Sequence, residues 1–173
     1  MDLRSRIRTV PHFPKQGIMF KDITTLLKDS GALRHAIKKM KGFCKGKQII
    51  KVVSAESRGF IFGAILAHEL GAGFVPVRKP GKLPAKTIRQ EYELEYGKDA
   101  FEIHIDAVSK GDKVLLVDDL LATGGTIKAA ADLVEKLGGD IAGIAFLIEL
   151  SYLSGRDKLK DYDVFSLIDY KEE

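Results

Sequence analysis

The sequence contains a single cysteine, Cys44, and no tryptophan. One cysteine cannot form an intramolecular disulfide, nor a zinc site that needs several thiolates. So little cysteine is typical of the reducing cytoplasm, where we expect the protein to act. Cys44 lies one helical turn after Met40, on an apolar stripe that also carries Ile37, and this spacing predicts a place in the core.

Long apolar runs are also absent. None approaches the ~20 residues that a membrane-spanning helix needs. The N-terminal segment M-D-L-R-S-R-I-R is charged and lacks the apolar region of a signal peptide. We therefore expect no membrane partner.

Charge of one sign is not in large excess. The 28 lysines and arginines outnumber the 24 aspartates and glutamates by only four, unlike the strongly basic surfaces of dedicated nucleic-acid binders. We expect no nucleic-acid partner, and a small polyanionic ligand suits this balance better. The length of 173 residues fits a single domain, which would bury roughly 70% of the surface of its unfolded chain.

Two common nucleotide-binding motifs are missing. The chain has no G-x-x-x-x-G-K-[ST] segment, and no G-x-G-x-x-G segment follows a strand-like run. The four histidines show no spacing typical of a metal site, and we expect no metal ligands among the side chains. A phosphate site, if there is one, must therefore be built differently.

Strand-like and helix-like segments alternate along the chain. Apolar residues at helical spacing predict helices over residues 29–43, 58–71 and 125–138. Runs rich in β-branched or alternating apolar residues predict strands over residues 49–55, 73–79, 102–108, 113–119 and 141–148. The N-terminal part predicts a short helix within the first twelve residues and an irregular loop over residues 14–27. This order indicates an α/β fold with a mainly parallel central sheet flanked by helices.

Residues 80–101 differ from their surroundings because they hold several prolines, glycines and charges. Within them Y-E-L-E-Y alternates polar and apolar positions, which predicts an extended ribbon. Alternation would place Glu91, Glu93 and Glu95 on one face of that ribbon. We interpret Glu91 and Glu93 as a solvated acidic edge.

The stretch V-L-L-V-D-D-L-L-A-T-G-G-T, residues 114–126, ends a buried strand with Asp118 and Asp119 and then opens a helix. Free backbone N–H groups at a helix start attract phosphate, and paired glycines let a ligand approach closely. The two acids would accept hydrogen bonds from ribose hydroxyls, with magnesium relieving their conflict with a phosphate. The alternative is an ordinary turn capped by Thr123 or Thr126, preceded by two solvated acids.

Two further polar clusters follow other strands. Ser57 and Arg58 would hold a second phosphate group, since arginine suits bidentate phosphate contacts. Arg78, Lys79 and Lys82 form a basic segment that is either a third part of the site or an exposed surface loop. Ligands of parallel sheets bind beyond the carboxyl ends of the strands, so we expect the three clusters to meet at one edge.

Several segments resemble a known family. Residues 114–126 resemble the phosphoribosyl pyrophosphate (PRPP) signature of the type I phosphoribosyltransferases. Other segments are similar to those of the adenine phosphoribosyltransferases within that family, namely F-P-K-Q-G-I-M-F-K-D-I-T, E-S-R-G-F-I-F-G, V-P-V-R-K-P-G-K-L-P, L-E-Y-G and F-S-L-I. The resemblance covers roughly residues 3–170. It implies one phosphoribosyltransferase domain over residues 1–173, with residues 1–30 as a small hood over the base and residues 80–101 as a mobile closing loop.

The resemblance implies an enzyme of purine salvage. It would transfer the 5-phosphoribosyl group from PRPP to adenine and release AMP and pyrophosphate. Magnesium would be its cofactor, held mainly through PRPP oxygens and water, and the enzyme would be a homodimer. Two alternatives stay open: transfer to another purine base (hypoxanthine, guanine or xanthine), and a non-catalytic regulator that binds PRPP.

The resemblance also implies roles for individual residues. Asp118 and Asp119 would contact the ribose hydroxyls during catalysis, and Glu95 would handle the proton of adenine. The 5′-phosphate would be held by Ala122, Thr123, Gly124, Gly125 and Thr126. The pyrophosphate would be held by Ser57, Arg58, Arg78, Lys79 and Lys82, some of them from a neighbouring subunit. The base would be covered by Phe20, Lys21 and Leu120. Glu56 stands where an aspartate is common, which leaves open whether the Glu56–Ser57 peptide bond is cis or trans.

Overall fold

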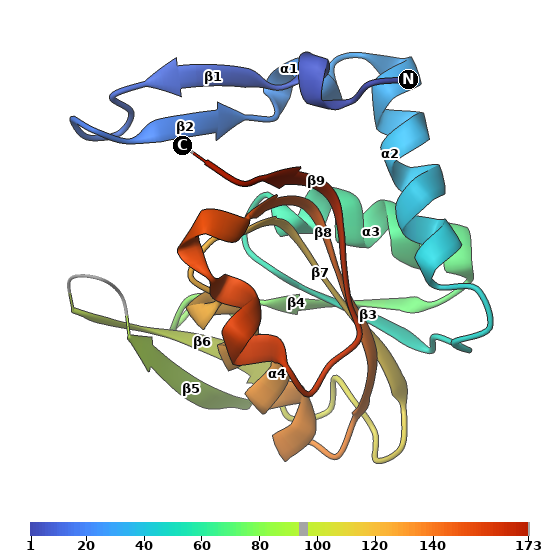
Figure 1. The fold of residues 1–173 in the computed structure, drawn as a ribbon. Coiled ribbons are helices and arrows are strands. Elements are labelled where there is room, and N and C mark those ends of the chain that lie inside the picture. Colours follow the sequence, from blue (N-terminus) through green and yellow to red (C-terminus); the bar gives the residue numbers. More distant parts are fainter. Residues whose placement is uncertain (94–96, 173) are drawn as a thin grey trace.

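The computed structural model describes residues 1–93 and 97–172 (Figure 1). Its centre is a five-stranded sheet in the order β4-β3-β7-β8-β9. The strands are β3 (Lys51–Ala55), β4 (Gly73–Val77), β7 (Lys113–Leu121), β8 (Asp140–Leu150) and β9 (Val164–Tyr170). All neighbouring strands in this sheet are parallel, so the predicted α/β fold with a mainly parallel sheet is confirmed.

Helices cover both faces of the sheet. They are α2 (Ser30–Phe43), α3 (Gly59–Leu70) and α4 (Gly125–Lys136), close to the predicted ranges. Adjacent residues of β7 point to opposite faces: Leu115 packs in the core shared with α2 and α3, whereas Leu116 packs in the core shared with α4. Cys44 lies buried in the first of these cores, as its apolar stripe predicted.

The N-terminal residues 1–30, here called the hood, lie over the edge of the sheet where β9 ends (Figure 1). They form a three-residue 3-10 helix η1 (Arg4–Arg6), β1 (Arg8–Pro11), β2 (Met19–Asp22) and α1 (Thr24–Leu27). The prediction of an irregular loop over residues 14–27 was wrong, and the helix predicted in the first twelve residues is only η1. The error arose because β2 is created by antiparallel pairing with β1, which a four-residue segment does not reveal by its own pattern.

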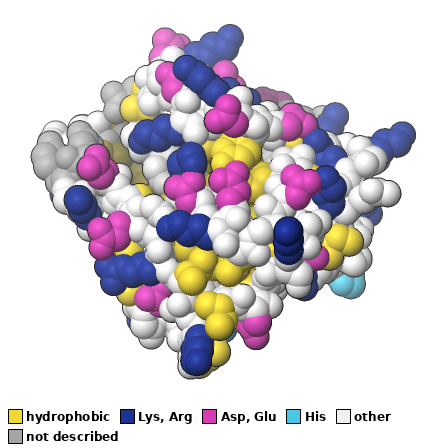
Figure 2. All heavy atoms as spheres, turned by 90° about the horizontal axis from the view of Figure 1, so that it is seen from below, with side chains coloured by type: hydrophobic (Ala, Val, Ile, Leu, Met, Phe, Trp, Pro, Cys, Tyr) yellow, Lys and Arg dark blue, Asp and Glu magenta, His cyan; other side chains and the backbone are white. Residues whose placement is uncertain are grey.

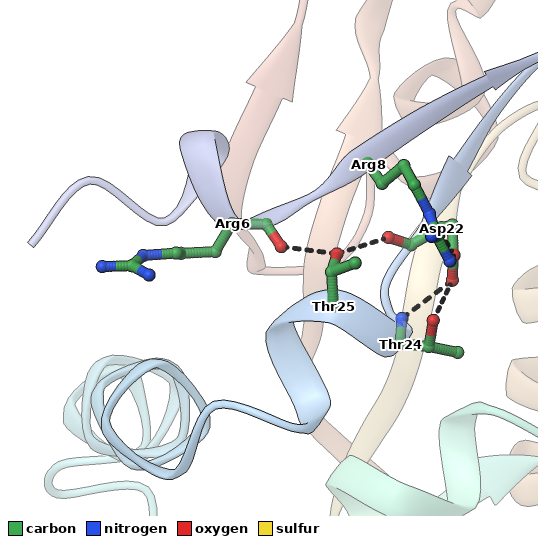
Figure 3. A network of polar contacts seen from close by, with 5 residues as sticks. All are labelled: Arg6, Arg8, Asp22, Thr24 and Thr25. Atoms are coloured by element: carbon green, nitrogen blue, oxygen red, sulfur yellow. Dashed lines mark hydrogen bonds and ion pairs between the residues drawn. The ribbon is translucent and has the colours of Figure 1, made fainter.

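Asp22 ties the hood together (Figure 3). Its Oδ2 accepts hydrogen bonds of 2.5 and 3.0 Å from the Arg8 guanidinium, and its Oδ1 accepts bonds from the hydroxyl and the backbone N–H of Thr24. Together these bonds, the Thr24 hydroxyl first, lower the pKa of Asp22 to about 2. Thr25 adds a 2.7 Å bond to the carbonyl of Arg6, so η1 is fastened to the start of α1.

Residues 80–101 contain β5 (Thr87–Glu93) and the first part of β6 (Lys98–His104). These two strands pair as an antiparallel hairpin. The predicted extended ribbon is therefore confirmed up to Glu93. The strand predicted over residues 102–108 was placed too late, because β6 is set by its pairing with β5 and ends at His104. A bridge between Arg78 and Glu102 links the hairpin to the end of β4. Phe101 lies in the α4-side core, so the base of the hairpin is anchored in the fold.

Basic and acidic side chains are interspersed on the face opposite the hood, with small apolar areas between them (Figure 2). One ion pair, between Lys113 and Asp140, joins β7 to β8. Another, between Lys128 and Asp132, joins two turns of α4. Within the described residues, no helix combines the length and the apolar character that crossing a membrane would require.

Candidate functional site

A pocket of about 250 Å³ lies where β3 and β7 end and α4 begins. It is lined by Glu56, Ser57, Arg58, Asp118, Asp119, Leu120, Leu121, Ala122, Thr123, Gly124, Thr126 and Ile127. The fold thus brings together two of the three polar clusters that the sequence singled out. One cluster follows β3 and the other lies at the end of the neighbouring parallel strand β7, which explains why residues some sixty positions apart share one cavity.

Asp118 and Asp119 lie inside β7, as the predicted strand over residues 113–119 implies, but β7 continues two residues further than predicted, to Leu121. β7 pairs with β3 only as far as Val117 and then continues beside β8 to Leu121. The two acids therefore occupy the part of the strand that extends past the end of β3. Only 9% of Asp118 and 5% of Asp119 is exposed, so the alternative of two solvated loop acids is excluded.

Asp118 sits in a confined and electrostatically unfavourable place. Burial, together with the neighbouring charge of Asp119, raises the pKa of Asp118 well above its ordinary value. Its Oδ1 accepts a 2.9 Å hydrogen bond from the backbone N–H of Asp119. A Cβ atom at Gly59 would lie 2.7 Å from the same oxygen, so the start of α3 needs glycine here. We assigned Gly59 no role from the sequence, although its motif E-S-R-G-F was the available signal.

Arg58 connects the two clusters. Its Nε lies 2.6 Å from Oδ2 of Asp119, and its guanidinium lies over the ring of Phe20, 5.2 Å from the ring centre. Its side chain is 43% exposed, so the guanidinium can change partner without disturbing the core. The Glu56–Ser57 peptide bond just before it is cis, and Ser57 is exposed at the mouth of the pocket.

Residues 122–126, here called the β7–α4 turn, lead into the helix. Gly124 is the N-cap of α4 and has φ = 80°, a left-handed conformation that glycine adopts without strain. The alternative of a threonine cap was therefore wrong, since the capping position carries no side chain. The N–H groups of the first helical turn, with the helix dipole behind them, form a site for an anion.

Glu56 joins the third polar cluster to the rim of the pocket. Its Oε2 accepts hydrogen bonds of 2.9 and 3.0 Å from Arg78, and its Oε1 accepts a 2.6 Å bond from the backbone N–H of Lys79. Lys82 is exposed, and its carbonyl accepts a long bond from Arg78. Among the described residues that line the pocket, none of these three basic residues is found.

Lys79 points instead to the hairpin. Its ammonium donates a 2.7 Å hydrogen bond to the hydroxyl of Tyr92 and forms an ion pair with Asp99. Burial opposes the charged form, but the bonds to Asp99 and Tyr92 outweigh it, so the pKa of Lys79 is raised. Tyr92 also contacts the hydroxyl of Thr126, which connects the hairpin to the β7–α4 turn. The sequence suggested no role for Tyr92 or Asp99, because their partners come from other elements.

The three residues expected at the base take different positions. Leu120 lines the pocket, and Phe20 reaches it from the hood by stacking on Arg58. Lys21 follows Phe20 in β2 and points the other way: its ammonium lies over the ring of Tyr170, 4.6 Å from the ring centre. Glu95, the candidate for proton transfer, lies outside the described residues.

The pocket offers oxygen ligands but no preformed metal cage. In residues 1–93 and 97–172, no three His, Cys, Asp or Glu side chains gather as a metal site. The carboxylates of Asp118 and Asp119 are hard oxygen donors of the kind that magnesium prefers, and magnesium commonly keeps waters and ligand phosphates in its coordination shell. A magnesium ion that arrives with a phosphorylated ligand therefore fits this arrangement.

Comparison with known proteins agrees with this geometry. The phosphoribosyl transferase domain family matches residues 22–173. An adenine phosphoribosyltransferase of Clostridium perfringens (strain SM101 / Type A) is 61% identical over 170 residues, which make up 98% of this chain and 99% of that protein.

Solved structures show the same likeness. The adenine phosphoribosyltransferase of Thermoanaerobacter pseudethanolicus superimposes with a TM-score of 0.95 at 56% identity, over 98% of each chain. The enzyme of Giardia lamblia, crystallised with 9-deazaadenine, superimposes with a TM-score of 0.93 at 40% identity, over 99% of this chain and 97% of that one.

Proposed function

Because the chain belongs to the phosphoribosyl transferase family, and its similar relatives there are adenine phosphoribosyltransferases, we propose that the pocket beside the β7–α4 turn binds PRPP and adenine. The protein is an enzyme of purine salvage that transfers the 5-phosphoribosyl group of PRPP to adenine and gives AMP and pyrophosphate. Its one cysteine is a buried free thiol, which supports the further proposal of a cytoplasmic location.

The single observation that carries the binding proposal is the junction of two buried acids with an open helix start. Asp118 and Asp119 line the same pocket as the β7–α4 turn. The N–H groups of that turn suit the 5′-phosphate, and the carboxylates suit the 2′- and 3′-hydroxyls of the ribose next to it. A ligand that carries only phosphate would be repelled by the acids, whereas a ribose phosphate satisfies both halves.

We assign binding of the pyrophosphate of PRPP to the cationic side of the pocket. Ser57 and Arg58 lie at its mouth, and Arg78 reaches its rim through Glu56. As pyrophosphate departs, negative charge develops on its oxygens, and guanidinium groups aimed at that charge lower the barrier. Magnesium would be held mainly by PRPP oxygens and water, and when bound it would neutralise part of the same charge.

The adenine would lie between the hood and the strand edge. Leu120 forms one wall, and Phe20 approaches from the hood. Holding the base in line with the ribose carbon is worth up to ~7–11 kcal/mol of the barrier, because it replaces a collision by a prearranged approach. We assign proton handling on adenine to Glu95, and exclusion of water to closure of residues 80–101.

We also propose a homodimer. β4 is an edge strand of the sheet, and Phe74 on it packs against Phe60 of α3. Phe74 and Ile61 are 36% and 37% exposed, so α3 and β4 present large apolar side chains to the outside. Such a surface is typical of a protein interface. Arg78 and Lys79 directly follow β4, so in such a dimer they would lie close to the interface.

The test is an incubation of the protein with PRPP and magnesium and, in separate reactions, adenine, hypoxanthine, guanine or xanthine. We expect AMP and an equal amount of pyrophosphate with adenine, and little nucleotide with the other bases. Faster turnover of another purine would overturn the adenine assignment. Binding of PRPP without turnover of any base would indicate a regulator and not an enzyme.

A further inference from the structure

Gly155 supports the β7–α4 turn from outside the pocket. Gly155 begins η3 (Gly155–Leu159), the short helix that follows η2 (Ser151–Leu153) after β8. A Cβ atom at Gly155 would collide with the carbonyl oxygen of Ala122 and lie 3.0 Å from the nitrogen of Gly124. A Cβ atom at Gly124 would in turn collide with the carbonyl oxygen of Gly155. The two backbones therefore touch, and the turn rests directly on Gly155.

The next residue, Arg156, is held on three sides. Its Nε and Nη2 donate hydrogen bonds of 3.0 and 2.5 Å to the two carboxylate oxygens of Glu149, which is a bidentate ion pair. Its Nη1 donates a 3.0 Å bond to the carbonyl of Val164, and its Nη2 a 3.2 Å bond to the hydroxyl of Ser166. Arg156 thereby joins η3 to both β8 and β9, the last two strands of the sheet.

The charges of this pair depend on each other. The side chain of Glu149 is only 8% exposed, at a position of β8 that is directly paired with Leu121 of β7. Its bond to Arg156 lowers the pKa of Glu149, and the same bond raises the pKa of Arg156. Both groups stay charged near neutral pH, and removing either one would leave the other without its main partner.

We propose that Glu149 and Arg156 are positioning residues for the 5′-phosphate site. The ion pair fixes η3 on the sheet, η3 presses Gly155 against the β7–α4 turn, and the turn keeps its N–H groups aimed at the phosphate. Ser154 supports this view, since its φ of 54° is one that residues with side chains seldom adopt, so the segment relies on its contacts to keep its shape. The inference rests on the proposed function, because it concerns the phosphate that PRPP would bring.

Arg156→Lys tests the proposal, because lysine keeps the charge but cannot form the bidentate fork. We expect the KM for PRPP to rise about 10-fold, since the free energy of phosphate binding depends on donor geometry, while the KM for adenine changes less than about 2-fold. Glu149→Gln keeps the shape and one acceptor, so it should raise the KM for PRPP in the same direction but by less. Asp140→Asn is the matched control: it breaks the exposed ion pair with Lys113 at the opposite end of β8, and both KM values should stay unchanged.

The outcomes separate the two proposals. Wild-type protein that makes no AMP from adenine and PRPP would end the proposed function, whatever the variants do. Active wild type with an unchanged KM for PRPP in Arg156→Lys, even at a lowered melting temperature, would mean that the pair only stabilises the fold. If Arg156→Lys does not fold, Glu149→Gln decides: an unchanged KM for PRPP in that variant also overturns the positioning role.

Discussion

The Nε atom of Arg58 lies 2.6 Å from Oδ2 of Asp119. These two residues are proposed to bind neighbouring parts of PRPP, the pyrophosphate and the ribose, yet here they form an ion pair with each other. The ion pair compensates the charge of a carboxylate whose side chain is only 8% exposed. Under the proposed roles we expect PRPP to separate the pair, because it would supply hydroxyls for Asp119 and phosphate oxygens for Arg58.

Asp119→Asn should lower kcat/KM about 10- to 150-fold. Hydrogen bonds to a charged group contribute about 1.5–3 kcal/mol, and each ~1.4 kcal/mol corresponds to a factor of ten in rate. Steady-state kinetics with PRPP and adenine measure the effect. Asp106→Asn, at an exposed position, is the control and should be silent. A normal rate and normal PRPP affinity in Asp119→Asn would refute the role.

Asp118→Asn should stabilise the fold while lowering activity. The pKa of Asp118 is raised by burial and by Asp119, so ionising it disfavours the folded state. The stability that comes from holding the proton is complete below pH ~3.8 and is lost as the pH rises towards the folded pKa. Near neutral pH we expect the variant to gain roughly 1 kcal/mol in free energy of unfolding.

Denaturant unfolding over a pH series measures this difference. The gain of Asp118→Asn over the wild type should be present at pH 7 and shrink as the pH falls below the folded pKa of Asp118. A variant that is less stable than the wild type at pH 7 would contradict the electrostatic explanation.

Asp22 makes the hood sensitive to acid. Its pKa is lowered to about 2 by the bonds from Thr24 and Arg8, so its contribution to stability is full above pH ~3.8 and is lost as the pH falls towards 2. Asp22→Asn should therefore unfold more easily than the wild type at pH 7, and the two curves should converge between pH 4 and pH 2. A constant difference over that range would show that the charge of Asp22 is not responsible.

Alanine variants of two glycines distinguish the cost of a left-handed backbone from the loss of the contact between the turn and Gly155. Gly17 and Gly124 have φ of 90° and 80°, but a Cβ atom at Gly17 would meet no atom within 4 Å, whereas one at Gly124 would collide with Gly155. Both alanine variants should cost roughly 1 kcal/mol of stability from the left-handed backbone. Only Gly124→Ala should also raise the KM for PRPP, by about 10-fold or more. The same KM for PRPP in both variants would contradict the view that the contact between Gly124 and Gly155 shapes the phosphate site.

Closure of residues 80–101 is tested by limited proteolysis. We expect cleavage within this range in the free protein and protection when PRPP and magnesium are added, because closure would exclude both water and protease from the site. Magnesium alone is the control and should not protect. The same cleavage rate in all three conditions would argue against a closing loop.

The parts of the fold that were predicted well have strong local patterns. The apolar run of residues 114–117 and the helical spacing of α2 and α4 are long enough to specify a buried strand and amphipathic helices. The hood and the end of β6 were predicted poorly, because their strands exist through pairing with another short strand. Lys79 shows the same limit at the site: its basic character suggested phosphate binding, whereas its actual partners, Tyr92 and Asp99, belong to a hairpin that the sequence only partly indicated.

The sequence alone determined the fold class, the family resemblance and the order of the polar motifs, since all three are written in local runs of residue types. The tertiary structure decided which of these residues meet. Extension of β7 past β3 buries Asp118 and Asp119, and the same geometry brings Arg58 onto Asp119. It also presses Gly155, about thirty residues downstream, against Gly124. The physical reason is that strand register and backbone contacts depend on the packing of the whole sheet. The residues of a single segment do not determine that packing.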